Sequence, residues 1–538
     1  MKRAPIPGLL FSLFFLCSSP AFSQQDFGEV AFANSGPPAV QADFIRALAQ
    51  LHNFEYEDAA EHFRAAQKAA PDFAMAYWGE AMTQNHPVWH EEDVAAAREI
   101  LKRLAPTPEA RLAKAATEHE KLYLHSVEVL FGEGTKEERD RRYEAELAEI
   151  HRKFPSDVDA AAFFALATLG TAEHGRDFAT YMRAAAVLEE VFPQHPRHPG
   201  VVHYLIHCYD DSVHAPLGLR AARIYSKIAP EAGHAQHMTS HIFLSLGMWD
   251  DVVKANETAM AVVNGVRQKA GKPPAMCGHY NEWLEYGYLQ QGRVADARRI
   301  LEGCRAAAEK LAAAAAASAS KSAGHEGMSM SGMTPASMTV SSYAEMRAHF
   351  LIGTQLWNDE AARWKIPAGD YPFAESAFDY TDTIAAVRRG DLAAAREAAA
   401  RTNASGQRAA AAMRKISNDS SMDDVFVVYN GELHAMLAAA EGKSPDAVAE
   451  LKSVATKEHA LPLEFGPPNI EKPTNELLGE LLLQLHKPAE ARDAFQAALA
   501  RTPGRKIDVE GLARAEKEIA ASASTDRDAK PASSSPPH

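Results

Sequence analysis

Apolar residues recur every three to four positions along most of the chain, and stretches that alternate between apolar and polar residues are scarce. Because an α-helix turns once in about 3.6 residues, this spacing places the apolar side chains on one face of a helix. The clearest stripes are Val202, Leu205, Ile206 and Tyr209, followed by Ala235, Met238, Ile242 and Leu246. The pattern predicts an all-α protein.

A short frame of small and large apolar residues recurs within these helices, and a proline often follows it. Small residues let two helices approach closely, and proline ends the second helix. Three copies are Ala59, Phe63, Ala66 and Pro71; Ala184, Leu188, Val191 and Pro196; and Ala491, Phe495, Ala498 and Pro503. Weaker copies follow the loop glycines Gly247, Gly292, Gly390 and Gly442. The frame predicts stacked helical hairpins.

This frame resembles that of tetratricopeptide-repeat (TPR) proteins, and the stretch between residues 195 and 249 resembles exported bacterial members. The resemblance implies a TPR-like helical-hairpin solenoid, a curved array whose concave face can hold a peptide or another protein. It implies no particular reaction.

The ends and the middle of the chain depart from the repeat. Lys2 and Arg3, an apolar run over residues 9–16 and a small residue at Ser23 predict a signal peptide over residues 1–23. The product is then exported, to the periplasm or outside the cell. The remaining predicted segments are an N-terminal solenoid over 24–310, a flexible Ala/Met-rich insertion over 311–342, C-terminal repeats over 343–515 and a disordered tail over 516–538.

Composition narrows the function classes. The 538 residues include 56 Lys and Arg against 71 Asp and Glu, for a net charge of −15. Such an acidic chain is a poor candidate for binding nucleic acid or anionic lipid. No stretch after the signal peptide is long and apolar enough to span a bilayer. Cys208, Cys277 and Cys304 remain after cleavage; Cys208 is expected in the core, and Cys277 and Cys304 are able to pair.

Histidine is the unusual residue, with 23 copies. His203 and His207 are four residues apart on one predicted helix, and His237 and His241 are four apart on the next. Both pairs are separated by 34 residues, which is the TPR period. Equivalent places on adjacent helices predict that these four imidazoles converge on the concave face and bind one metal ion.

Other polar residues near this segment are candidates for additional ligands or for supporting contacts to the imidazoles. They are His234, His214, Asp210, Asp211, Glu173, His174 and Glu282, with His279 and the turn that contains His86, Trp89 and His90 as further candidates. Each of them also has an ordinary role as a capping, turn or surface residue.

A methionine-rich tract lies in the insertion, at Met328, Met330, Met333 and Met338. Thioethers favour Cu(I), so the tract favours copper over zinc as the cofactor. A low-complexity linker is the alternative explanation.

Three hypotheses for function follow. The first is a transition-metal-binding solenoid, which would be a metalloenzyme if a coordination position stays open. The second is a scaffold that binds a peptide or protein without metal. The third is a copper storage or delivery protein. The sequence contains no HExxH motif, P-loop or GxSxG motif that would indicate a particular reaction.

Overall fold

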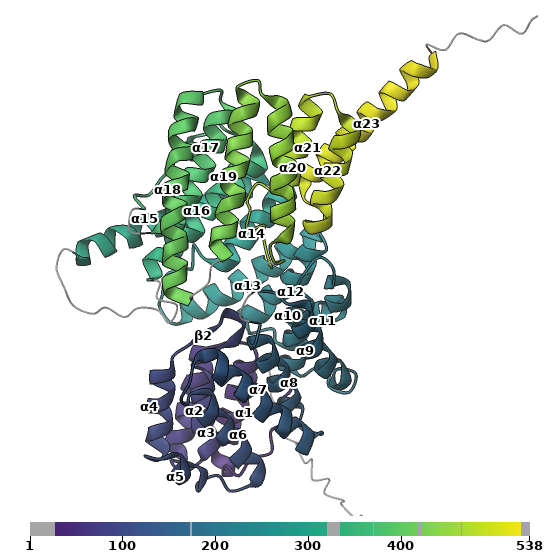
Figure 1. Ribbon diagram of the computed structural model, residues 1–538. Coiled ribbons are helices and arrows are strands. Elements are labelled where there is room, and N and C mark those ends of the chain that lie inside the picture. Colours follow the sequence, from purple (N-terminus) through teal and green to yellow (C-terminus); the bar gives the residue numbers. More distant parts are fainter. Residues whose placement is uncertain are drawn as a thin grey trace, which may run out of the picture.

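The computed structural model describes residues 27–172, 175–319, 334–368, 371–417, 421–463 and 465–528. Over these ranges the chain is almost entirely α-helical, which confirms the predicted class (Figure 1). The exception is a two-stranded antiparallel sheet in which β1 (Asn85–His86) pairs with β2 (Glu91–Glu92). The expected signal peptide lies outside the described residues.

The helices follow one another with short connections. The N-terminal third contains η1 (Pro38–Val40), α1 (Gln41–His52), α2 (Tyr56–Ala69), α3 (Ala74–Met82), η2 (Pro87–Trp89), α4 (Val94–Leu104), α5 (Pro108–Leu112), α6 (Glu118–Leu130), α7 (Lys136–Lys153), α8 (Val158–Gly170) and α9 (Phe178–Val191). The central part contains α10 (Pro199–Tyr209), α11 (Ala215–Ile228), α12 (Gly233–Ser245), α13 (Trp249–Lys269), α14 (His279–Gln290) and α15 (Val294–Ala319). The C-terminal part contains α16 (Pro335–Thr354), η3 (Glu360–Arg363), α17 (Pro372–Arg388), α18 (Leu392–Ser417), α19 (Ser421–Ala440), α20 (Ser444–Ala460), α21 (Thr474–Gln484), α22 (Pro488–Arg501) and α23 (Lys506–Asp528).

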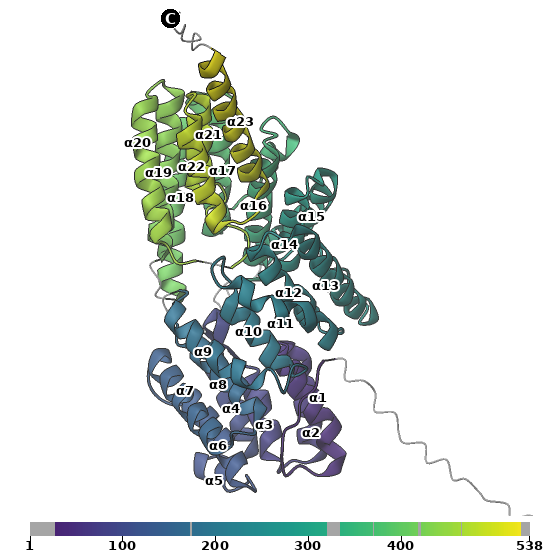
Figure 2. The ribbon, with the colours of Figure 1, turned by 90° about the vertical axis from the view of Figure 1, so that its right-hand side faces the viewer.

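Consecutive helices pack as antiparallel hairpins, and the first helix of one hairpin also contacts the first helix of the next, as α10 does with α8 and α12. All four predicted loop glycines sit in hairpin turns with positive φ, between +68° and +82°. Glycine adopts this left-handed backbone without steric cost, so it ends the first helix and lets the second fold back. The array is therefore a TPR-like helical-hairpin solenoid, as predicted (Figures 1 and 2).

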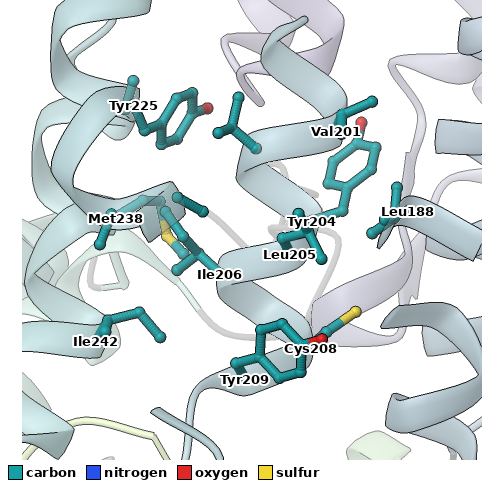
Figure 3. Packing of buried hydrophobic residues seen from close by; sticks show 14 of the residues in the cluster. Leu188, Val201, Tyr204, Leu205, Ile206, Cys208, Tyr209, Tyr225, Met238 and Ile242 are labelled. Carbon is teal, nitrogen blue, oxygen red and sulfur yellow. The ribbon is translucent and has the colours of Figure 1, made fainter. Parts of the chain in front are cut away.

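The apolar stripes form a continuous interior along the array. Around α10 and α12, Leu205, Ile206, Met238 and Ile242 interlock between the two helices, and free Cys208 packs in the same cluster (Figure 3). Each residue is almost completely removed from water. The two stripes read from the sequence thus form the core that fixes α10 beside α12.

Contacts between distant parts of the sequence add to the neighbour-to-neighbour stacking. Helix α1 packs directly against α10, although more than 140 residues separate them. Near the C-terminus, the Trp249 indole donates to the Gly504 carbonyl at 2.8 Å, and the Lys506 amide donates to the Gln290 side chain at 2.9 Å. The last hairpins therefore return to the middle of the chain.

Two predicted boundaries need correction. Helix α15 continues to Ala319 and α16 begins at Pro335, so helix occupies both ends of the range assigned to a flexible insertion. Helix α23 extends to Asp528, into the range assigned to a disordered tail. Alanine has the highest helix propensity, so alanine-rich segments continue a helix that the repeat frame no longer marks.

Cys277 and Cys304 form a disulfide that joins the start of α14 to α15. Within the described ranges, none of the helices combines the length and hydropathy needed to cross a membrane.

Candidate metal centre

Helices α10 and α12 position the histidines. Pro199 opens α10, and the His198 ring accepts a hydrogen bond from the Val201 amide at 3.3 Å as its N-terminal cap. At the start of α12, the Glu55 carboxylate accepts a hydrogen bond from the His234 amide at 3.2 Å. Burial raises the pKa of Glu55 to about 7, against the opposing effect of these helix amides. The apolar stripes then fix the rotation of both helices, which turns their histidines toward the same interior.

The first imidazole group consists of His203, His207 and His234. The Nε2 atom of His203 lies 3.1 Å from the Nε2 atoms of both His207 and His234. On the opposite side of its ring, His203 Nδ1 donates to the His52 carbonyl at 2.7 Å. A carbonyl only accepts hydrogen bonds, so the proton of neutral His203 is on Nδ1 and a lone pair on Nε2 faces the other two rings.

The second imidazole group consists of His237, His241 and His279. The Nε2 atoms of His237 and His241 are 3.0 Å apart. His237 Nδ1 donates to the Asn256 Oδ1 atom at 2.6 Å, and His241 Nδ1 donates to the Asp210 carboxylate at 2.5 Å. Asn256 is held in this orientation because its Nδ2 donates to the Val252 carbonyl. The His279 ring completes the group, with its centroid 4.6 Å from that of His237.

The spacing of these ring nitrogens suits a shared cation. In neutral His237 and His241 both lone pairs point at one another, and only a proton or a metal ion between the rings makes this contact attractive. Two nitrogens bound at about 2.0–2.1 Å to one ion lie roughly 2.9–3.4 Å apart, which matches the observed spacing. Carboxylate, amide and carbonyl groups hold the far nitrogens, as supporting contacts do in metal sites.

Aromatic rings pack against both groups. Phe54, in the turn between α1 and α2, stacks edge-on against His203 with 4.3 Å between centroids, and Trp283 covers His241 at 4.3 Å. Burial lowers the pKa of His203, His207, His234 and His237 well below the ordinary value, and neighbouring imidazoles lower it further. These rings are therefore neutral near pH 7, which is the form that binds metal.

The buried imidazoles make the stability of the metal-free protein depend on pH. Because the folded pKa values are lowered, the unfolded chain takes up protons below about pH 6.5 that the folded chain does not. The contribution of these imidazoles to the free energy of unfolding is therefore fully present above that pH and is lost as the pH falls. We expect the free energy of unfolding to drop by on the order of a few kcal/mol between about pH 7.5 and 5.5, measured by urea denaturation. A His203→Gln, His237→Gln variant should show a shallower dependence; equal urea midpoints at both pH values in the wild-type protein would contradict the assignment.

The four histidines predicted to share one metal site fall into two separate groups in the structure. His203 and His207 join His234 in one group, whereas His237 and His241 join His279 in the other. The exposed fraction of the four predicted ligands is at most 4%, so they lie between helices and not on an open concave face. These side chains are buried because α1, α13 and α14 cover α10 and α12.

The other candidates have different surroundings. Asp210 orients His241, but Asp211 accepts from Arg176 and from His214 Nδ1, both at 2.9 Å, and belongs to a network at the end of α10. Arg176 also donates to the His207 and Cys208 carbonyls, a role that sequence reasoning missed.

Glu282 lines a cavity beside the second group. Glu173, His174, Met328, Met330 and Met333 lie outside the described residues.

The turn around Trp89 borders the first group without joining it. The Trp89 and His234 ring centroids are 6.2 Å apart, whereas His86 stacks on Tyr56 at 4.0 Å. His90 adopts a left-handed conformation with φ of 54° at the end of η2.

A third cluster, His52, Asp159 and His198, differs from the two imidazole groups. Asp159 Oδ1 accepts from His52 Nε2 at 2.8 Å and from His198 Nε2 at 3.2 Å, and His52 Nδ1 contacts the Tyr204 hydroxyl at 3.0 Å. Burial alone would raise the pKa of Asp159, but hydrogen bonds from both histidines lower it. The Oδ2 atom of Asp159 makes no hydrogen bond in the described structure. The bonds through Oδ1, together with the contact between His52 and Tyr204, tie α1 and α8 to α10.

Comparisons with known proteins add little to this geometry. No known protein family and no curated protein sequence matches the chain. Solved structures with some similarity include APC/C Cut9–Hcn1 (10% identity, 90% of this chain and 78% of that chain, TM-score 0.36), yeast Tom70 (10%, 90% and 96%, 0.33) and the P58(IPK) TPR domain (11%, 90% and 99%, 0.21). These scores are low, so the description of the fold rests on the helical hairpins of this chain.

Proposed function

We propose that this protein is an exported TPR-like solenoid that binds transition metal ions through its two imidazole groups. Copper is the favoured ion because of the methionine tract near residue 330, and zinc is the second choice. The disulfide between Cys277 and Cys304 supports export, because disulfides persist in oxidising compartments.

The observation that carries the proposal is the pair of facing Nε2 atoms of His237 and His241, 3.0 Å apart. Their other ring nitrogens donate to groups that only accept, so the facing atoms are free to coordinate. Each group supplies three protein ligands. In zinc enzymes that arrangement leaves the fourth coordination position for water or substrate, so it supports the metalloenzyme alternative as well as simple binding.

A protein- or peptide-binding scaffold without metal is the second candidate. The stacked hairpins themselves favour it, because such arrays present an extended curved surface to a partner. The third candidate is copper storage or delivery. Storage predicts several Cu(I) ions per chain and sensitivity to deletion of residues 325–338, whereas binding in the imidazole groups is insensitive to that deletion.

Metal analysis of the protein, purified without chelator and then reconstituted with Cu(II) or Zn(II), tests the proposal. We expect about two ions per chain, one in each imidazole group. Metal content is measured by inductively coupled plasma mass spectrometry after removal of loosely bound ions. Less than about 0.2 ions per chain before and after reconstitution would refute metal binding and leave the scaffold function.

A further inference from the structure

A cavity of about 700 Å³ lies between α14, α16, α17 and α19 and the segment that precedes α21. Its volume is typical of sites for small organic molecules, which are roughly 300–1,000 Å³. His279 of the second imidazole group forms part of its wall. The side chain of His279 is exposed.

One part of the cavity wall is acidic. Glu282 and Glu345 share a hydrogen bond between their carboxyl groups, and Glu471 accepts the Tyr429 hydroxyl at 2.5 Å. Burial raises the pKa of both Glu282 and Glu345, and their mutual repulsion raises that of Glu282 further. Among the described residues that line the cavity there is no lysine or arginine. Three carboxyl groups therefore face this space without a cationic side chain of the lining beside them.

A buried hydroxyl also lacks a partner here. Ser376 lines the cavity, its exposed fraction is 3%, and its Oγ atom makes no hydrogen bond in the described structure. Ser341 Oγ, in the same wall, is likewise without a hydrogen bond in the part of the chain described. A buried hydroxyl without a hydrogen bond costs about 1–3 kcal/mol, so a polar group of a ligand would satisfy it.

The rest of the wall is apolar. Phe373, Phe426, Met422 and Pro467 contribute carbon-rich surface around the space. A ligand that fills the cavity therefore meets carboxyl groups on one part and apolar side chains on the other. Among the described residues, these carboxyl groups belong to none of the clusters of potential metal ligands.

We propose that this cavity binds a small organic cation, a protonated amine carried on an aromatic or aliphatic body. The ammonium group donates up to three hydrogen bonds, enough to contact the carboxyl pair and a serine hydroxyl at once. Its positive charge offsets the repulsion between the carboxyl groups of Glu282 and Glu345. The apolar body packs against Phe373 and Phe426.

Binding of three probes that share a phenylethyl body tests the proposal, by isothermal titration calorimetry on the metal-free full-length protein. The probes are 2-phenylethylamine as cation, 2-phenylethanol as neutral control and 3-phenylpropionate as anion. We expect the amine to bind at least about 10-fold more tightly than the alcohol, and the anion not to bind. Equal affinities, or preference for the anion, would overturn the proposal.

Matched variants locate the site. Glu345→Gln should weaken amine binding about 10-fold or more and leave alcohol binding unchanged, whereas Glu450→Gln on α20 should change neither. Ser376→Ala gives a second, milder variant, and far-ultraviolet circular dichroism checks folding of all three. Unaltered amine affinity in folded Glu345→Gln would refute the assignment.

The proposal is separable from metal binding because the probe is measured without metal. If the protein binds the amine but no metal, the cavity proposal stands and the proposed metal-binding function is refuted. If it binds metal but not the amine, only the metal-binding function stands.

Discussion

Replacing His207 by alanine removes about one metal ion per chain, replacing His241 removes the other, and the double variant His207→Ala, His241→Ala retains essentially none. Each substitution takes away one of three coordinating nitrogens and leaves two imidazoles in its group. Loss of a contact that merely supports a ligand lowers metal affinity about 10–100-fold, and loss of the ligand itself costs at least as much. Metal content after dialysis, measured by mass spectrometry, gives the result for each variant.

The control for this experiment is His434→Ala. His434 is exposed and pairs with Glu450, far along the chain from both imidazole groups. It should keep the full metal content. A supporting-contact variant, Asn256→Ala, should weaken only the ion of the second group, because Asn256 contacts His237. If single and double histidine variants with native helicity bind as much metal as the wild-type protein, the two groups are not the metal sites.

Replacing Arg505 by alanine destabilises the protein by about 3–5 kcal/mol, the usual effect of removing one partner from a buried ion pair. The exposed fraction of Arg505 is 3%, and its Nε atom donates to Glu476 at 2.5 Å. Its other nitrogens donate to the Tyr286 hydroxyl at 2.8 Å and to the Glu471 carbonyl at 3.1 Å. One side chain thus joins α14, the segment before α21 and the start of α23.

The charge of Glu476 supplies much of this effect. Burial favours its protonated form, but Arg505 and Lys472 outweigh burial and hold the pKa of Glu476 below its ordinary value. Without Arg505 the buried carboxylate keeps only Lys472 as a partner. Urea denaturation measures the loss. Combining Arg505→Ala with Glu476→Gln should recover part of the stability, and Arg293→Ala on the exposed surface should change it by less than about 1 kcal/mol. An Arg505→Ala variant as stable as the wild-type protein would contradict the predicted role.

The helices of the central hairpins could be predicted closely from the sequence. The stripes containing Leu205 and Met238 identify α10 and α12, and Pro199 marks the start of α10, because amphipathic spacing and proline act within a few residues. Gly247 marks the turn after α12 for the same local reason. The ends of α15 and α23 could not be predicted, because alanine continues a helix without any repeat signal.

The candidate site was only partly predictable. The 34-residue register correctly placed the two histidine pairs at equivalent positions of neighbouring first helices, but it could not show which third ring each pair would meet. His234 was one of several candidates, and His279 had no periodic relation to the pairs. The contacts of His203 with the His52 carbonyl and of His237 with Asn256 depend on packing of α1 and α13.

The sequence by itself determined the class of fold, the positions of the central hairpins and the repetition of paired histidines. These properties follow from local periodicity, since a helix and its turn depend on residues a few positions apart. Only the tertiary structure decided that the imidazoles form two separate groups, that Asp210 and not Asp211 orients His241, and that Glu282 faces Glu345 in a cavity. Those pairings join residues of different helices, and the relative rotation and tilt of packed helices is set by the combined packing of many side chains.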